Sequence, residues 1–350
     1  MPDDPSDGAR NEFTRQVVFA IYFSCMSDAL TPEQLRLMFA FFPEPAKQRM
    51  ELIQNNGRFV HYTRAENALK IIRHKKVWMR KPQWMNDYSE IEHGFQSLKY
   101  MLHKGEGGKR FKAALDAALP EWKDTALKPF DQWINSYQSN SYVACVSAHD
   151  SRDDNGGRLT MWRAYCPQGD GVAFVLNSSP FTAISDVLGA YSYPVSYRNQ
   201  QEVDDYFGLI AENIEKESEL IKNSDRNMLA HLLHELFRFE MLCTKHGSFV
   251  DEREWRIVHS PDRDKRNPQH LQKSVEIIGG APQPIYSIPL EALPGYDISL
   301  PAILERVIIG QVKTGFRDAI FESLCHELES VGVSEPWKLI SYSEIPLRLS

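Results

Sequence analysis

The chain has 350 residues, 42% of them hydrophobic and 25% charged, a composition typical of a folded protein with one large domain or two ordinary ones. Its formal net charge of −7 at pH 7 excludes a general attraction to phosphate backbones, so nucleic-acid binding would need a local basic patch. Five widely spaced cysteines without a CxxC pair predict neither a disulfide framework nor a cysteine zinc site, which indicates a cytoplasmic protein.

Helices are expected first along the chain. Residues 1–9 have the polar composition of a disordered leader. The apolar run 17–26 is about half as long as a bilayer crossing requires, so it predicts a buried helix and no membrane segment. Thr31 and Gln34 have the spacing of a capping box, with a proline at the first helical position. These features predict an N-terminal helical segment over residues 1–57.

From residue 58 on, strands and helices follow one another without a regular βα rhythm, which is typical of the α+β class. Two helices begin with the spacing of a capping box, one at Thr63 with Glu66 and one at Asp87 with Glu90. The expected domain, 58–350, contains strands at 58–63, 76–82, 141–148, 171–177, 189–198, 254–260, 284–290, 305–312 and 337–345, helices at 63–76, 86–102, 160–165 and 316–332, and helical insertions near 104–138 and 200–243.

The stretch GSFVDEREWRIVHS, residues 247–260, places three charged residues at alternate positions. In a strand, Glu252, Glu254 and Arg256 would point to one face. One interpretation is a ladder of surface ion pairs, each worth about 0.2–1 kcal/mol. The other is the floor of an active site. Two interpretations are also open for Lys245, which lies just before this stretch: it contacts a phosphate, or it is a surface charge.

Three segments, taken in order, resemble the ADP-ribosyltransferase fold. FVHYTRAENALKII is similar to the strand and helix that open this fold in diphtheria-type toxins, and it supplies His61, Tyr62 and Thr63. RAYCPQGDGVAFVLN resembles the segment of poly(ADP-ribose) polymerases that carries their ring-stacking tyrosine, which corresponds to Tyr165. EREWRIVHS resembles their catalytic strand, which places Glu254 on the catalytic glutamate.

The resemblance implies an ADP-ribosyltransferase-like split β-sheet core, with NAD bound as a substrate between the half-sheets and no metal. Loss of nicotinamide passes through an oxocarbenium-like ribose, which a neighbouring carboxylate stabilises. An aromatic ring can stack on the nicotinamide. By the resemblance, the catalytic residues are Glu254, Tyr165 and Glu252, which would activate the acceptor, and the NAD-binding residues are His61, Tyr62, Thr63, Tyr165 and Arg256.

A second resemblance covers most of residues 58–310. It is to a bacterial family of uncharacterised proteins with the pattern HYT, ND…E, MW…Y…G and E.EWR. Bacterial transferases of the His-Tyr-Glu type often act as toxins or defence effectors. The resemblance therefore implies transfer of ADP-ribose to an unknown macromolecular acceptor, either a protein or a nucleic acid.

Several alternatives stay open from the sequence. With water as the acceptor, the same residues would make an NAD glycohydrolase. A non-catalytic module would bind a nucleotide or peptide, and a metal-dependent nuclease would be built on Asp87 and Glu90. Taken singly, His61 fits a satisfied core histidine, and Tyr165 fits a ring packed under its helix. Tyr62 is a departure, because the toxins and polymerases usually have glycine there: its side chain must point away from the ligand or contact it.

Overall fold

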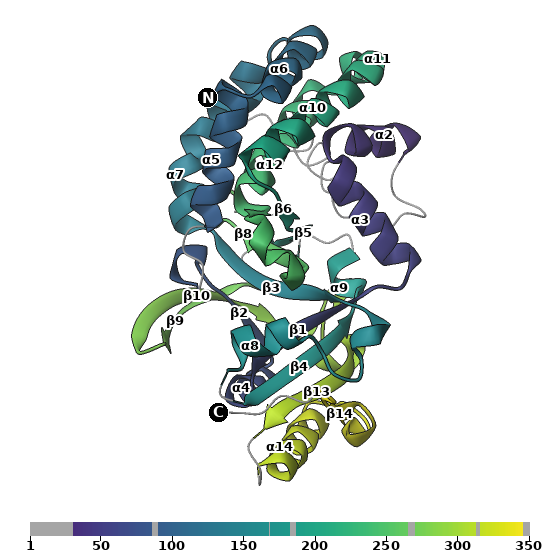
Figure 1. Cartoon of the computed structure of the whole chain (residues 1–350), viewed down its shortest axis with the longest axis vertical. Coiled ribbons are helices and arrows are strands. Elements are labelled where there is room, and N and C mark those ends of the chain that lie inside the picture. The colour runs from purple at the N-terminus through teal and green to yellow at the C-terminus, as the bar shows by residue number, and fades with distance from the viewer. Residues whose placement is uncertain are drawn as a thin grey trace.

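Two β-sheets lie at the centre of the computed structural model, which describes residues 31–85, 90–167, 169–182, 187–264, 270–312 and 316–345. A body of helices packs on one side of them, and the C-terminal helix lies at the opposite end (Figure 1). The larger sheet has seven strands, in the order β14 (Ile340–Tyr342), β13 (Leu304–Val312), β4 (Asp170–Asn177), β1 (Arg58–Arg64), β3 (Tyr142–His149), β8 (Glu254–His259) and β5 (Tyr191–Pro194). The smaller sheet has the order β2 (Lys76–Met79), β10 (Ala281–Pro289) and β9 (Gln272–Ile278).

The larger sheet opens between β1 and β3. β1 pairs with β4 along its whole length, from Arg58 opposite Asn177 to Arg64 opposite Gly171. It pairs with β3 only over its first three residues, which end at Val60 opposite Ser147. Beyond Val60 the two strands part, while β3 stays paired with β8. The sheet is therefore continuous at one end of β1 and divided at the other.

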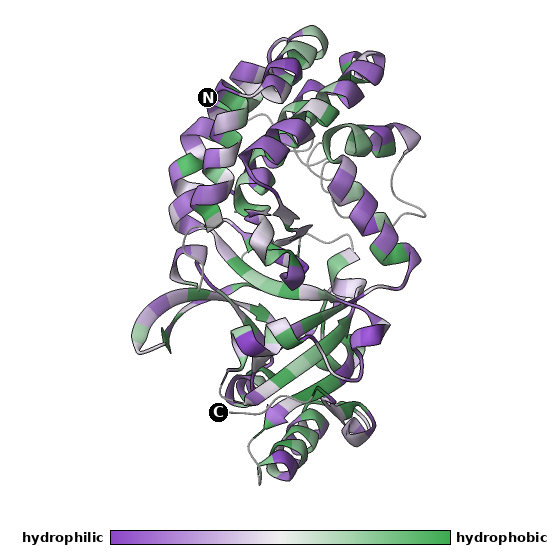
Figure 2. Ribbon diagram, in the orientation of Figure 1, coloured by the Kyte–Doolittle hydropathy of each residue, from purple (hydrophilic) through white to green (hydrophobic). Residues whose placement is uncertain are grey.

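The sequence explains where the core of the sheet lies. The central strands β3 and β4 are largely hydrophobic along their length, whereas the outer helices alternate between hydrophobic and hydrophilic residues (Figure 2). Strands that are covered on both faces need apolar side chains on both faces. Against one face pack α4 (Ala65–His74), which follows β1 directly, and α14 (Arg317–Ser330). The mixed sheet with a separate helical body confirms the predicted α+β class.

The N-terminal helices and both predicted insertions share one hydrophobic core. The first insertion supplies α6 (Glu106–Ala118) and α7 (Lys128–Asn140), and the second supplies α10 (Gln200–Lys216), α11 (Ser218–Asn223) and α12 (Arg226–Cys243). They pack with α2 (Pro32–Phe41), α3 (Pro43–Gln54) and α5 (Glu90–His103). Three separate parts of the chain thus form a single helical body.

The two insertions are joined by one buried carboxylate. Asp204 of α10 accepts hydrogen bonds from the backbone N–H groups of Gly107 and Gly108, at 3.0 and 2.8 Å, in the first turn of α6. Asp204 therefore caps the N-terminus of α6, because the N-cap residue Gly105 makes no side-chain hydrogen bond. Gly107 is required by this close approach, because a Cβ atom there would lie 1.9 Å from the Asp204 carbonyl oxygen. Residues 105–108, which contain three glycines, thus form the start of α6.

Two of the predicted helix caps differ in outcome. The capping box of Thr31 with Gln34 is confirmed, since both reciprocal hydrogen bonds form. The capping box of Thr63 with Glu66 is wrong: Thr63 is still paired with Val172 in the β1–β4 ladder, and Arg64 is the N-cap without a side-chain cap bond. β1 runs directly into α4, so Thr63 is a strand residue and is not the N-cap of the helix.

Other expectations fall beyond the described residues or were incomplete. The leader 1–9, the apolar run 17–26 and the cap at Asp87 lie outside the part that the structure describes. Strand β9 was not predicted, because its apolar residues Val275 and Ile277 are exposed and give no burial pattern typical of a core strand. Within the described ranges, no helix is both long and apolar enough to cross a membrane.

We expect Asp204→Ala to lower the free energy of unfolding by about 2 kcal/mol, because two helix-terminal N–H groups lose their acceptor in a buried setting. Asp204→Asn should cost less, since its amide oxygen still accepts one bond. Urea unfolding followed by circular dichroism measures both values. Asp205→Ala is the control, because the neighbouring carboxylate is exposed. An equal effect at both positions would contradict the capping role of Asp204.

Candidate active site

A cavity of about 470 Å³ lies where β1 and β3 part. Its volume is within the range of small-molecule sites, about 300–1,000 Å³. One wall is β1, a second is β3, and a third is the face of α4 together with β2. The turn between β9 and β10 closes one side. The polar and charged residues of the lining are His61, Tyr62, Thr63, Arg64, Glu66, Asn67, Lys70, His74, Lys76, Arg80, Ser147, Tyr165, Glu252 and Glu254.

Most of the residues singled out from the sequence meet in this cavity. His61, Tyr62 and Thr63 line it from β1, Tyr165 lines it from the end of α8 (Leu159–Tyr165), and Glu252 and Glu254 line it from the start of β8 and the turn before it. These residues come from three segments that are far apart in the sequence. Of the predicted residues, Arg256 is not part of the lining.

Glu254 is the most constrained of these side chains. It is 6% exposed, and its Oε1 accepts a hydrogen bond from Arg256 Nε at 2.8 Å while its Oε2 accepts one from Lys245 Nζ at 3.3 Å. Its own N–H donates to the hydroxyl of Tyr197 at 2.7 Å. Burial opposes ionisation of this carboxyl, but Arg256 and Lys245 outweigh burial and lower its pKa below the usual value. Glu254 is therefore an anion at neutral pH.

Glu252 also lines the cavity, but it lies on a short helix before β8 and not on the strand itself. It ends a short 3₁₀ helix, Gly247–Glu252, and Arg253 follows in a left-handed conformation with a φ of 47°. The expected alternation of Glu252, Glu254 and Arg256 on one strand is therefore wrong, because the strand begins only at Glu254. Glu252 Oε2 instead accepts from Lys245 Nζ at 2.7 Å. Lys245 bridges the two carboxylates.

Lys245 and Arg256 correct two interpretations of the sequence. Lys245 is 4% exposed and lies between Glu252 and Glu254, so it is neither a surface charge nor a free phosphate contact. Arg256 is 1% exposed and also donates to the carbonyl oxygen of Leu242 at 2.6 Å. Its predicted contact with NAD does not fit this position, since the guanidinium lies behind Glu254. Two buried cations thus pair with two carboxylates. The ladder of surface ion pairs that was one interpretation of the sequence is therefore wrong.

Tyr62 and Tyr165 are connected through α8. The side chain of Tyr62 is 4% exposed and packs edge-on against Trp162, with ring centroids 4.8 Å apart. Its hydroxyl accepts from the N–H of Arg158, the N-cap of α8, at 2.9 Å. Although Tyr62 borders the cavity, its ring and hydroxyl are engaged with α8, and it fixes the helix that ends at Tyr165.

Tyr165 itself is not packed under its helix. It is 36% exposed and lines the mouth of the cavity. Desolvation of the phenol, reinforced by the negative charges of Glu252 and Glu254, raises its pKa. The ring is therefore neutral at physiological pH, and its hydroxyl is available as a hydrogen-bond donor near the two carboxylates.

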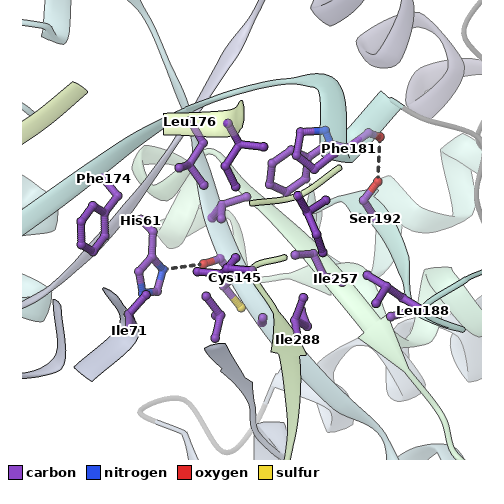
Figure 3. A pocket seen from close by; sticks show the side chains of 18 of the residues that line it. His61, Ile71, Cys145, Phe174, Leu176, Phe181, Leu188, Ser192, Ile257 and Ile288 are labelled. Atoms are coloured by element: carbon purple, nitrogen blue, oxygen red, sulfur yellow. Dashed lines mark hydrogen bonds between the residues drawn. The ribbon is translucent and has the colours of Figure 1, made fainter. Parts of the chain in front are cut away.

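His61 approaches the cavity from the other side of the sheet. Val60, Ser147 and Glu254 are in register across β1, β3 and β8, so they share one face. His61, next along β1, points to the opposite face and spans the opening, where its Nδ1 lies 3.2 Å from the Cys145 carbonyl oxygen (Figure 3). Desolvation lowers the pKa of His61 against the opposing effect of this hydrogen bond, so the imidazole is neutral and Nδ1 donates. A flat sheet would separate His61 from Glu254, and only the opening lets both line one cavity.

Charged side chains lie on two walls of the cavity, and several of them are paired: Lys70 with Glu66, and Glu252 and Glu254 with Lys245 and Arg256. Lys70 and His74 lie on the α4 face that lines it, and Lys76 and Arg80 follow along and just beyond β2. Glu252 and Glu254 lie at the other wall. This arrangement suits a ligand that has negative charge at one end and develops positive charge at the other.

A metal site was one of the alternatives. Within the described ranges, no three or more His, Cys, Asp or Glu side chains are grouped in a way that could hold a metal ion. Asp87, on which the nuclease interpretation depends, lies outside those ranges. The histidine pair His231 and His234 belongs to α12, where His234 is buried and its Nε2 lies 2.6 Å from the Tyr137 hydroxyl.

Comparison with protein families finds one match. A model described as "Protein of unknown function (DUF2971)" matches residues 161–257. This segment contains the cavity residues Met161, Tyr165, Glu252 and Glu254, together with Lys245 and Arg256 behind them. The chain is similar to an uncharacterised family in this part. No curated protein and no solved structure matches the chain.

We expect Glu254→Gln to lower the free energy of unfolding by about 3 kcal/mol at pH 7, because it leaves two buried cations short of one anion. Its pKa is lowered in the folded state, so the carboxylate stabilises the fold fully above pH 4.5, the unperturbed value. This contribution is lost as the pH falls through the lower folded-state pKa. The difference between wild type and variant should therefore be constant at pH 6–8 and shrink below about pH 4.5, measured by urea unfolding.

The matched control is Glu219→Gln, which removes a carboxylate from an exposed pair with Lys222. It should leave stability nearly unchanged at every pH. If Glu254→Gln behaves in the same way, the carboxylate is not held by buried cations.

Proposed function

We propose that this protein is an NAD-dependent ADP-ribosyltransferase, which cleaves the bond between nicotinamide and ribose and transfers ADP-ribose to a macromolecular acceptor. The observation that carries the proposal is the meeting of His61, Tyr165 and Glu254 in one cavity at the opening of the sheet. This opening also supports the resemblance to the split sheet of ADP-ribosyltransferases. A toxin or defence role would follow from the same resemblance.

Each residue would act through a property described above. Glu254 is anionic and buried, so it can accept a hydrogen bond from the ribose 2′-hydroxyl and stabilise the positive charge that develops at C1′. Tyr165 offers a neutral ring at the cavity mouth that can stack on nicotinamide. His61 is neutral, and its Nε2 can accept a hydrogen bond from the adenosine ribose. The basic wall of Lys70, Lys76 and neighbouring side chains suits the diphosphate.

The reaction would proceed by substitution at C1′. The bond from C1′ to the nicotinamide nitrogen breaks, and its electron pair leaves with neutral nicotinamide. A nucleophilic atom of the acceptor forms the new bond to C1′ and loses its proton. Glu252 would accept this proton, because its side chain is 18% exposed and Lys245 bridges it to Glu254.

Hydrolysis is the second candidate function. Tyr165 is 36% exposed at the mouth of the cavity, so water has access to the wall that carries the carboxylates. With water as the acceptor, the same substitution gives free ADP-ribose, and the protein is an NAD glycohydrolase. Product analysis distinguishes the two functions.

Purified protein incubated with NAD labelled in both the nicotinamide and the adenine should release nicotinamide without added metal, and a cell lysate should supply the acceptor. Glu254→Gln should lower the rate of release by about 100-fold or more, because the developing charge loses its counterion. The double variant Glu254→Gln with Lys245→Met removes one anion and one cation together. We expect it to be more stable than the single variant and equally inactive, which separates a catalytic loss from unfolding.

No nicotinamide release with any lysate, together with no NAD binding by calorimetry, would refute the proposal. NAD binding without release would identify a non-catalytic module.

Glu252→Gln tests the division of labour between the two carboxylates. We expect transfer to the acceptor to fall by at least about 10-fold, while release of nicotinamide to water is partly retained, because Glu254 still stabilises the ribose cation. The measurement is the ratio of labelled macromolecule to free ADP-ribose in the same reaction. An equal loss of both products would show that Glu252 does not act on the acceptor.

A further inference from the structure

A second, smaller cavity lies behind the first, on the face of the larger sheet that His61 points to. Its volume is about 100 Å³, and it is enclosed between β4, β1, β3, β8 and β5 on one side and β2, β10 and the segment 290–303 on the other. We call it the inner chamber (Figure 3). Its apolar lining includes Phe174, Leu176, Phe181, Ile257, Ile288 and Ile303.

The polar groups of the lining are already engaged, with one exception. The Ser192 hydroxyl donates to the carbonyl oxygen of Phe181 at 3.0 Å and accepts from Arg49 at 3.0 Å. The Tyr296 hydroxyl donates to the carbonyl oxygen of Pro180 at 2.6 Å. A ligand in the inner chamber would therefore meet almost only carbon atoms there.

His61 is the exception. Its Nδ1 is bonded to the Cys145 carbonyl oxygen, and Nε2 makes no hydrogen bond to any of the residues that the structure describes. Because Nδ1 donates, Nε2 is an acceptor. The chamber thus combines an apolar lining with one hydrogen-bond acceptor.

The chamber exists because small side chains line it where larger ones would fill it. Ala144, Ala190 and Ser192 all contribute to its wall. Protein interiors are close-packed and contain few voids larger than a water molecule. An apolar cavity of about 150 Å³ stays dry and binds benzene or xenon, so a space of this size and chemistry takes small apolar molecules.

The inner chamber is next to the proposed active site. His61, Ile71, Val77, Ala144, Cys145 and Val146 line both cavities. A ligand that extends from the outer cavity into the chamber would pass this shared set, in which His61 offers the imidazole.

We propose that the inner chamber is a binding site for a small neutral aromatic group that carries one hydrogen-bond donor, placed to donate to Nε2 of His61. Phenol represents this chemistry: a ring that fits an apolar space and a hydroxyl for the single acceptor. Charged analogues are excluded, since the chamber offers no counterion and burial of a charge is costly. This site does not depend on NAD, and its ligand would share His61 with the outer cavity.

The test uses the full-length protein with isoleucine methyl groups labelled for NMR, titrated with phenol. We expect saturable shifts of the Ile257, Ile288 and Ile303 methyl resonances and of the His61 ring, with methyl groups remote from the chamber unaffected. Benzene should cause the same methyl shifts with at least about 3-fold weaker binding, because it lacks the donor. Benzoate should cause none. This mapping is made on the wild-type chain and requires no variant.

Ala190→Leu should weaken phenol binding by at least 10-fold, because the added carbons occupy the chamber. Ala113→Leu on the exposed side of α6 is the control and should leave it unchanged. If Ala190→Leu does not fold, Ile257→Phe serves as the filling variant. Phenol shifts that are non-saturable or spread over surface methyl groups would overturn the proposal, as would full binding by a folded filling variant. None of these measurements involves NAD, so their failure would leave the proposed transferase function untouched.

Discussion

The parting of β1 and β3 after Val60 is the constraint on which the rest of the site depends. Neighbouring residues of a strand point to opposite faces, so a continuous sheet would keep His61 and Glu254 apart. Where the ladder ends, one cavity is lined by side chains from both faces of the sheet. The same opening removes inter-strand hydrogen bonds from β1, and the contact of His61 with the Cys145 carbonyl replaces one of them.

The second constraint is the balance of buried charge. Glu252 and Glu254 bring two negative charges to the cavity wall, and Lys245 and Arg256 supply two positive charges behind them. Buried ions are tolerated when they are paired and hydrogen-bonded, and removing one partner is costly. The arrangement keeps Glu254 anionic although its side chain is buried. An anion so prepared needs little reorganisation when a positive charge develops beside it.

Regular features were predictable from the sequence, and long-range ones were not. The strands containing His61 and Glu254 were predicted close to their observed bounds, because local apolar patterns determine them. Glu252 was misplaced by a left-handed Arg253, since nothing in the residue types signals that turn. Lys245 and Asp204 were missed because their partners lie on other elements. Strand β9 was missed because its apolar residues face solvent.

Arg256 has a consequence that reaches beyond the site. One of its nitrogens holds Glu254, and another holds the carbonyl oxygen of Leu242 near the end of α12. Leu242 belongs to the common core of the helical body, where α12 packs against α5 and α7. A single rigid guanidinium thus joins the bundle to the carboxylate, with no flexible link between them. The end of α12 therefore belongs to the scaffold that positions the Glu254 carboxylate, although the two lie on different elements of the fold.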